Sequence, residues 1–228
     1  MATGSLRASD VAYEQLRTRI LDLRLPPGSV VNEHAIAAEL GMSRMPVHEA
    51  VARLAADRFI AVLPGRQSVV TAFDLQDVLG MFDAREAIEG GAARIAAERA
   101  TARDLDSMRR LVQVADQPRR GSDRERLLRE DHEIHSFLVH TIRNALLQDA
   151  ADRLLLHNWR TWRSYASWRT AHDPGAMSHS SLLTALEARD GEGAERAMRA
   201  HIGDSRRLLL SSMEGAPTAV GTATANAP

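Results

Sequence analysis

Four side chains in the second half of the chain have types and spacing that could bind a metal ion: Asp131, His135, His179 and His201. Asp131 and His135 are four residues apart, which places both on one face of a helix. His179 and His201 fall in the last two helical segments, which a short break joins, so we expect these segments to lie antiparallel. One carboxylate and three imidazoles from three helices can therefore converge inside a helical bundle.

The donor atoms of these residues determine which metals they could bind. The chain contains no cysteine, so any transition-metal site must use imidazole and carboxylate ligands. This set suits zinc, nickel, manganese or iron(II), and it leaves coordination positions open when the metal is five- or six-coordinate. An open position could activate water in a metalloenzyme, although no neighbouring motif supplies a general base. Because the chain has nine histidines, a structural role for these residues is also possible.

Composition excludes several classes of protein. With 228 residues, of which 44% are hydrophobic, the chain is long enough for one large domain or two small ones. A net charge of −1 excludes a uniformly basic surface but not a local basic face. All 29 basic residues are arginine, which argues against a Schiff-base enzyme and a P-loop. The sequence shows neither a long apolar run nor the apolar core of a signal peptide, so we expect a soluble, cytoplasmic protein.

Helices must position the four candidate ligands, because the sequence after Asp74 is rich in Ala, Leu, Arg and Glu and has few breakers. Asp74, Thr101 and Ser122 are expected to cap the first three of these helices. The predicted helices span residues 74–99, 102–116, 122–142, 145–170, 175–189 and 191–213. Within the fourth helix, four aromatic residues at helical spacing are interpreted as core or dimer surface rather than a ligand cage: Trp159, Trp162, Tyr165 and Trp168.

The first part of the chain carries a different pattern, of short helices followed by a hairpin. Ser9 or Asp10 can cap the first helix, and the PPG sequence at 26–28 is expected to end it. Gly41 separates two further helices, and this order of elements is typical of a winged helix-turn-helix. The predicted elements are helices over 9–23, 33–40 and 43–57, and strands over 59–63 and 68–72.

We therefore predict a mainly α protein with two domains. Residues 1–73 form the winged helix-turn-helix, residues 74–213 form an all-helical bundle, and residues 214–228 form a small, polar tail that is expected to be disordered.

The helix that begins near Ser43 is the candidate for insertion into a major groove. Arg44, at its start, can donate two hydrogen bonds to a guanine or bind a phosphate. Ser43 and the N–H groups of the first turn suit a phosphate, and Arg53 and Arg66 can add backbone contacts. Residues 1–73 contain eight arginines and seven acidic residues, so a monomer should bind DNA weakly. A dimer that spans two half-sites is therefore expected.

The first part also resembles the DNA-binding domain of GntR-family bacterial regulators. The resemblance rests on LPPG at 25–28, NE at 32–33 and AAELGMSRMPVHEA at 37–50. His48 and His34 stand where the family commonly has arginine, and Met45 replaces a small hydroxyl residue. These departures imply an operator other than the family's usual one. The DNA-contacting positions implied together are His34, Ser43, Arg44, Met45, His48, Arg53 and Arg66.

The second part resembles the helical effector-binding domain, often called FCD, of the FadR subfamily of these regulators. It carries MFDAREAIE at 81–89, Asp131-x-x-x-His135 with Asn144, HSSLLTAL at 179–186 and RAHI at 199–202. The resemblance implies that a divalent metal, zinc first and otherwise nickel or manganese, binds Asp131, His135, His179 and His201. It also implies that Arg85 binds a carboxylate effector, although a plain ion pair with Glu89, four residues later, is the alternative.

These observations together predict a ligand-responsive transcriptional regulator, acting as a homodimeric repressor, and not an enzyme. A small carboxylate bound at the metal site would modulate the affinity for operator DNA. Two alternatives stay open: a metal-dependent, hydrolase-like enzyme, and a regulator whose metal is structural or absent and which a partner controls. The sequence identifies neither the effector, the operator, the regulated genes nor the metal, and it does not distinguish a repressor from an activator.

Overall fold

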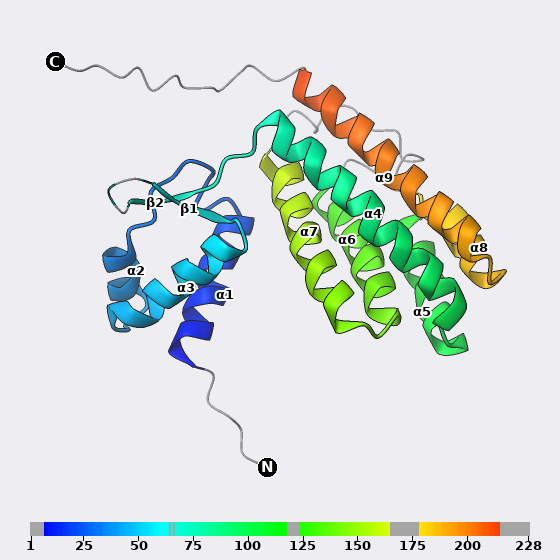
Figure 1. Ribbon diagram of the computed structural model, residues 1–228, viewed down its shortest axis with the longest axis horizontal. Helices are drawn as coiled ribbons and strands as arrows, with labels where there is room; N and C mark the ends of the chain where they lie inside the picture. The colour runs from blue at the N-terminus through cyan, green and yellow to red at the C-terminus, as the bar shows by residue number, and fades with distance from the viewer. Residues whose placement is uncertain (1–6, 64, 66, 118–123, 165–177, 215–228) are drawn as a thin grey trace, which may run out of the picture.

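The computed structural model describes residues 7–63, 65, 67–117, 124–164 and 178–214, and these form two lobes that follow one another along the chain (Figure 1). The predicted Ser122 cap, Arg66, Tyr165, Trp168 and the tail from Gly215 lie outside the described residues. None of the described helices is both long and apolar enough to cross a membrane.

The first lobe is a three-helix unit with a two-stranded wing. The strands pair antiparallel, with Ile60 opposite Val70 and Leu63 opposite Gln67. Ile60 of β1, Val70 of β2 and one stripe of each helix enter a small apolar core beneath the wing. The elements are α1 (Ala8–Leu21), α2 (Glu33–Glu39), α3 (Arg44–Ala56), β1 (Ile60–Leu63) and β2 (Gln67–Val70).

The second lobe is a bundle in which the long helix α4 packs along α9 and also contacts α6 and α7 (Figure 1). Its core is apolar and continuous, and it includes Phe82, Ile134 and Trp162. The helices are α4 (Leu75–Arg99), α5 (Ala102–Ala115), α6 (Arg124–Thr141), α7 (Ala145–Ser164), α8 (Ser180–Glu187) and α9 (Gly191–Glu214). The predicted mainly α class, with a winged helix-turn-helix and a helical bundle, is confirmed.

Helix ends confirm some of the predicted caps and correct others. Asp74 and Thr101 each accept a hydrogen bond at a helix start and belong to complete capping boxes. Helix α1, however, begins after Arg7, and Asp10 lies in its first turn with its carboxylate bonded to Arg53. The helix ends at Leu21, before the PPG sequence, because the backbone already turns at Leu23, whose φ is 59°.

The predicted start of the fifth helix of the bundle also shifts. Helix α8 begins at Ser180 instead of residue 175, and His179 occupies its N-cap position instead of lying within the helix. His179 therefore directly precedes the first residue of α8, where the backbone is not helical and the imidazole can turn toward α6 and α9.

Helix α7 joins the two lobes through His157. Its Nε2 donates to the carbonyl oxygen of Asp57, the C-cap residue of α3, at 2.9 Å. The imidazole stacks on Phe59 with ring centroids 4.3 Å apart. Arg160, one turn further along α7, is fully buried and donates to the Thr71 hydroxyl at 3.0 Å. The end of the candidate recognition helix is thus attached directly to the bundle.

The burial of His157 between the two lobes predicts that the free energy of unfolding depends on pH. Burial, together with the positive charges of Arg160 and Arg58, lowers the pKa of His157 from 6.5 to about 4. The unfolded chain therefore binds a proton that the folded chain excludes between pH 6.5 and 4, and stability falls as the pH falls through this window. Replacing His157 with Phe keeps a ring against Phe59 and should remove about 1–2 kcal/mol of the stability difference between pH 7 and pH 5.

Urea unfolding at both pH values measures this difference. His140→Phe, at an exposed position of α6, is the matched control and should leave the pH dependence as in the wild type. An unchanged pH dependence in His157→Phe would show that the imidazole titrates freely in the folded protein.

Candidate metal centre and DNA-contact surface

The four predicted metal ligands meet in one buried cluster, the His3Asp cluster (Asp131, His135, His179 and His201). Helix α6 supplies Asp131 and His135 one turn apart, the N-cap of α8 supplies His179, and α9 supplies His201. One ligand atom from each residue lies within 4.8 Å of the other three. The convergence that the spacing predicted is therefore present in the fold.

The distances within the cluster fit a metal ion. The His135 and His179 Nε2 atoms are 3.2 Å apart, and His201 Nε2 lies 3.2 Å from Asp131 Oδ1. Asp131 Oδ1 is 3.5 Å from His135 Nε2 and 3.6 Å from His179 Nε2. Two ligands of a tetrahedral zinc, each about 2.0–2.1 Å from the ion, lie about 3.3 Å apart. The cluster is thus compatible with metal binding in both donor type and spacing.

A second layer of polar contacts orients His135. Its Nδ1 hydrogen-bonds to Glu89 of α4, a fully buried carboxylate. Glu89 also accepts a hydrogen bond from Arg85 Nε at 2.6 Å, and Arg85 Nη2 lies 3.4 Å from His135 Nδ1. An acceptor at Nδ1 fixes the tautomer and aims Nε2 into the cluster, which is the usual arrangement behind a metal-binding histidine.

The charges around His135 are strongly coupled. Burial by itself would raise the pKa of Glu89, but the charges of Arg85 and His135 outweigh it and hold the pKa at about 2. Burial disfavours the charged form of His135, yet Glu89 and Asp131 raise its pKa to about 9. Burial and the neighbouring imidazoles lower the pKa of His179 well below its usual value. At neutral pH, Glu89 is thus an anion and His179 a neutral donor suited to a metal.

Arg85 lies beside the cluster but behind His135. Its side chain is 1% exposed, and its Nε and Nη2 both face Glu89. The ion pair that the i+4 spacing allowed is therefore formed, although it is buried and not on the surface. Contact between Arg85 and an effector stays a prediction.

The predicted DNA-contacting residues lie on exposed parts of α2 and α3. Ser43 is the N-cap residue of α3 but makes no side-chain cap hydrogen bond. Arg66 lies outside the described residues, and the exposed ones are His34, Ser43, Arg44, Met45, His48 and Arg53.

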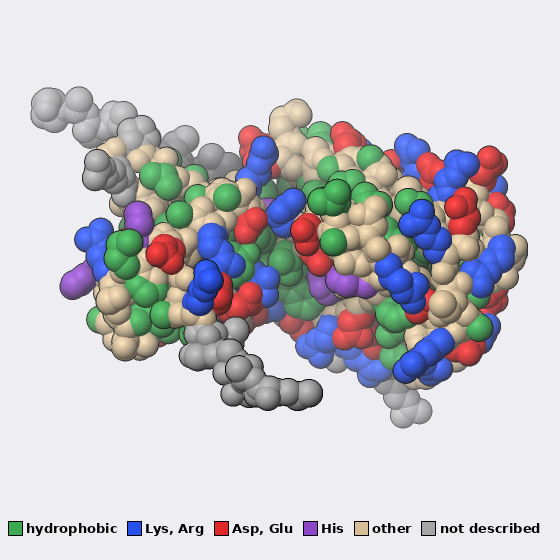
Figure 2. All heavy atoms as spheres, turned by 60° about the horizontal axis from the view of Figure 1, so that its bottom comes forward, with side chains coloured by type: hydrophobic (Ala, Val, Ile, Leu, Met, Phe, Trp, Pro, Cys, Tyr) green, Lys and Arg blue, Asp and Glu red, His purple; other side chains and the backbone are tan. Residues whose placement is uncertain are grey.

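Acidic partners already engage three of these residues within the lobe. Glu33 lies 3.1 Å from His48 Nδ1 and 3.8 Å from the Arg44 guanidinium. Arg53 donates to Asp10 at 2.7 Å and lies over the Tyr13 ring, an arrangement that packs α1 against α3. Among the described side chains, Arg44 has only this long contact with Glu33 and stays largely exposed, whereas the contacts of Arg53 have a structural role. On the face shown in Figure 2, acidic and basic side chains are interspersed.

Comparison with known proteins assigns both lobes. Residues 8–70 match the family described as "Bacterial regulatory proteins, gntR family", and residues 80–204 match the FCD domain. The chain belongs to the GntR family of regulators. It is 32% identical, over 86% of each chain, to a probable D-xylose utilization operon transcriptional repressor of Paenarthrobacter nicotinovorans. It is 29% identical, over 83% of each chain, to the transcriptional repressor RspR of Escherichia coli K12.

Solved structures agree with this assignment at the level of the fold. The E. coli protein McbR/YncC superposes with a TM-score of 0.76 at 21% identity, over 92% of this chain and 100% of that one. A putative GntR regulator from Rhodococcus sp. RHA1 gives a TM-score of 0.70 at 21% identity, over 91% and 99%. This GntR protein is a DNA-binding transcriptional regulator, and its relatives' names agree with the predicted absence of enzymatic activity.

Sequence reasoning assigned Glu89 only as a surface partner of Arg85 and missed its contact with His135. It also missed His157 and Arg160. The i+4 spacing of Arg85 and Glu89 indicated their ion pair. Nothing in the sequence, however, connects either residue to His135, which is 46 residues away from Glu89.

Trp162 is buried in the bundle core, as predicted, and Trp159 is half-buried against it.

Proposed function

We propose that this GntR regulator is a homodimeric repressor whose affinity for operator DNA is modulated by a small organic acid bound at a divalent metal. The His3Asp cluster carries the proposal, because three imidazole nitrogens and one carboxylate oxygen face each other inside the bundle at ligand-to-ligand distances. Nothing else in the described part of the chain gathers four such donors.

The residues around the cluster suit this role. Asp131, His135, His179 and His201 would hold the ion, most simply zinc, with nickel or manganese as alternatives. If the bound metal is five- or six-coordinate, it would offer an open coordination position to a carboxylate oxygen. Glu89 keeps His135 oriented, and the guanidinium of Arg85 keeps Glu89 charged and adds positive potential near the site.

Helix α7 supplies a physical connection between effector site and DNA-binding lobe. It packs against α6, which carries Asp131 and His135, and it bonds to the C-cap of α3 through His157. A ligand that favours one placement of α6 would therefore change the relative population of two arrangements of α7 and α3. In a dimer, this changes the spacing of two recognition helices and hence the affinity for paired half-sites.

Replacing Arg44 with Ala tests the DNA-binding surface. Arg44 is exposed at the start of α3, where a side chain reaches a base edge or a phosphate, so its loss should cost about 1–3 kcal/mol per half-site. The dissociation constant of the dimer should rise at least tenfold. Fluorescence anisotropy on an operator selected from random DNA measures it.

Arg103→Ala is the matched control, because Arg103 is an exposed arginine of α5 and its loss changes the net charge equally. If both variants lose affinity to the same extent, binding depends on overall charge and α3 is not the recognition helix.

An Asp131→Ala variant distinguishes the proposed sensor from its alternatives. A carboxylate-sensing regulator should keep operator binding and lose its response to carboxylates, which are screened by anisotropy on the wild-type complex. A metalloenzyme would lose turnover instead. A regulator under the control of a protein partner would lose neither property, and that result would contradict the proposal.

A further inference from the structure

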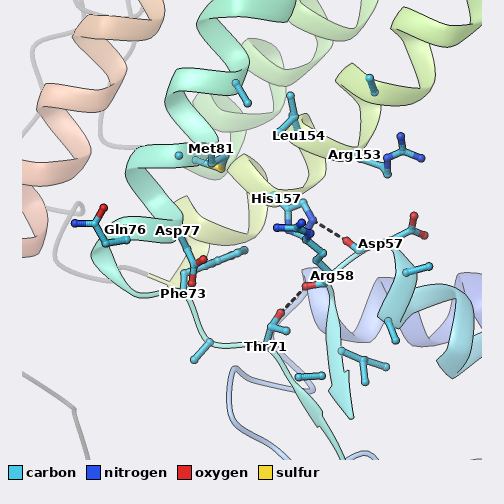
Figure 3. Close-up of a pocket in the computed structure, with 18 of the residues that line it drawn as sticks. Asp57, Arg58, Thr71, Phe73, Gln76, Asp77, Met81, Arg153, Leu154 and His157 are labelled. Atoms are coloured by element: carbon cyan, nitrogen blue, oxygen red, sulfur yellow. Dashed lines mark hydrogen bonds between the residues drawn. The ribbon is translucent and has the colours of Figure 1, made fainter. Parts of the chain in front are cut away.

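A cleft of about 780 Å³ separates the two lobes and lies apart from the His3Asp cluster (Figure 3). One wall comes from the end of α3, the start of β1 and the segment that leads into α4. The opposite wall comes from α4 and α7. The space-filling view shows hydrophobic side chains in the hollow between the lobes (Figure 2). Small-molecule sites have volumes of roughly 300–1,000 Å³ and often lie between domains.

The walls of this cleft are mainly apolar. Phe73, in the segment that leads into α4, packs against the core of the bundle, as do Ile88 and Leu154, and Met81 belongs to that core. Gly80 of α4 adds open space, because a Cβ placed there would meet nothing within 4 Å. A ligand with a flat or branched apolar body of moderate size fits these walls.

The polar groups of the cleft favour an anion. Arg58 and Arg153 are exposed at its edge, and within the described part of the chain neither guanidinium pairs with a carboxylate. The two carboxylates of the lining are already engaged: Asp57 accepts a hydrogen bond from Tyr13, and Asp77 belongs to the capping box of α4. The cations are therefore available to a ligand, while the acidic groups are not.

His157 connects this cleft to α3, the candidate recognition helix. Its imidazole lines the cleft, and its Nε2 bonds to the carbonyl of Asp57 at the end of α3. The other ring nitrogen, Nδ1, is buried and has no hydrogen-bond partner among the residues that the structure describes. A ligand in the cleft would touch both lobes and His157, whose hydrogen bond connects α7 to the end of α3.

We propose that the interdomain cleft is a second ligand site, which binds an organic anion with an apolar body. Its carboxylate or sulfonate would pair with Arg58 and Arg153, and its apolar body would pack between Phe73, Met81 and Leu154. Arg85 and Glu89 belong to the buried face of α4, whereas Ala84 and Ile88 of the same helix line the cleft. The two sites are therefore separate and can be tested separately.

The test uses the fluorescent anion 1-anilinonaphthalene-8-sulfonate, which has the proposed chemistry, titrated into the full-length protein in the presence of zinc. We expect saturable binding of about one molecule per chain. Arg58→Gln/Arg153→Gln should weaken binding at least tenfold, because the sulfonate loses both charged partners. Gly80→Leu should do the same by filling the cleft.

Gly91→Leu is the matched control. Gly91 is also a glycine of α4 at which a Cβ would meet nothing within 4 Å, but it lies outside the cleft. Both leucine variants replace a helical glycine in open space and should fold at least as stably as the wild type. Only Gly80→Leu should lose binding.

The His179→Ala/His201→Ala variant separates this site from the metal centre. It should bind the anion as the wild type does, whether or not the proposed metal function is correct. Loss of binding in that variant would place the anion at the metal centre and overturn the proposal. Equal binding by all the cleft variants would also overturn it, because the anion would then bind elsewhere on the surface.

Discussion

We expect the wild type to retain about one divalent metal ion per chain, and protein in which His179 and His201 are both replaced by Ala should purify without it. These residues supply two of the three imidazoles in the His3Asp cluster, and their Nε2 atoms lie 3.2 Å from His135 and from Asp131 respectively. The remaining histidine and aspartate, both on α6, form at most a two-ligand site. Elemental analysis after dialysis without chelator measures the content.

Stability provides an independent measure of the same site. A metal present at 100 times its dissociation constant stabilises the folded state by about 2.7 kcal/mol. For a chain of this size, this corresponds to a rise in Tm of about 5–10 °C. The wild type should show this rise when zinc is added after chelation, and the double variant should not.

The matched control is His34→Ala/His140→Ala, which removes two exposed histidines outside the cluster and should leave metal content and the Tm rise intact. A wild type that stays empty after incubation with zinc, nickel and manganese would contradict the site. In that case the cluster would be a structural network of buried histidines, and the search for an effector would turn to apolar ligands or a protein partner.

Replacing Glu89 with Ala should destabilise the metal-free protein by about 3–5 kcal/mol. Glu89 is fully buried and is the hydrogen-bonded partner of both Arg85 and His135. Its removal leaves the guanidinium of Arg85 in the interior without a compensating charge, and it also leaves a cavity. The pKa of about 2 for Glu89 means that this loss applies throughout the neutral pH range. Urea unfolding in the presence of chelator measures it.

A paired substitution separates lost charge balance from lost packing. Arg85→Met/Glu89→Gln removes both charges, keeps the side-chain volumes similar and retains an acceptor for His135 Nδ1. The double variant should therefore be less destabilising than Glu89→Ala. Such a departure from additivity is expected for residues in contact.

Metal affinity should fall about 10- to 100-fold in Glu89→Ala, because the orientation of His135 is lost.

Glu98→Gln, at an exposed position of the same helix, serves as the control and should change the unfolding free energy by less than about 0.5 kcal/mol. If Glu89→Ala changed the unfolding free energy as little as Glu98→Gln, Arg85 would have another partner in the folded protein. The ion pair of Arg85 and Glu89 would then not determine the orientation of His135.

The sequence by itself determined most of the local structure. Hydrophobic periodicity and breakers predicted the elements of both lobes, because each depends on residues within a few positions of one another. The capping boxes at Asp74 and Thr101 are of this kind. The errors occurred where a cap or turn depends on distant contacts: Asp10 pairs with Arg53, 43 residues away, instead of capping α1.

The four cluster residues were also predicted, for a physical reason. The four-residue spacing of Asp131 and His135 fixes a helix face, and the short break between the last two helices brings His179 near His201. The family resemblance then selected these histidines among nine. Local spacing thus allowed the four residues to converge, and the family resemblance was needed to select them.

The tertiary structure alone decided what surrounds the cluster and how the lobes meet. Glu89 reaches His135 because α4 packs against α6, and His157 reaches Asp57 because α7 lies against the end of α3, 100 residues apart in the chain. No local pattern encodes such contacts, because they depend on the relative placement of whole helices, which the packing of the core determines.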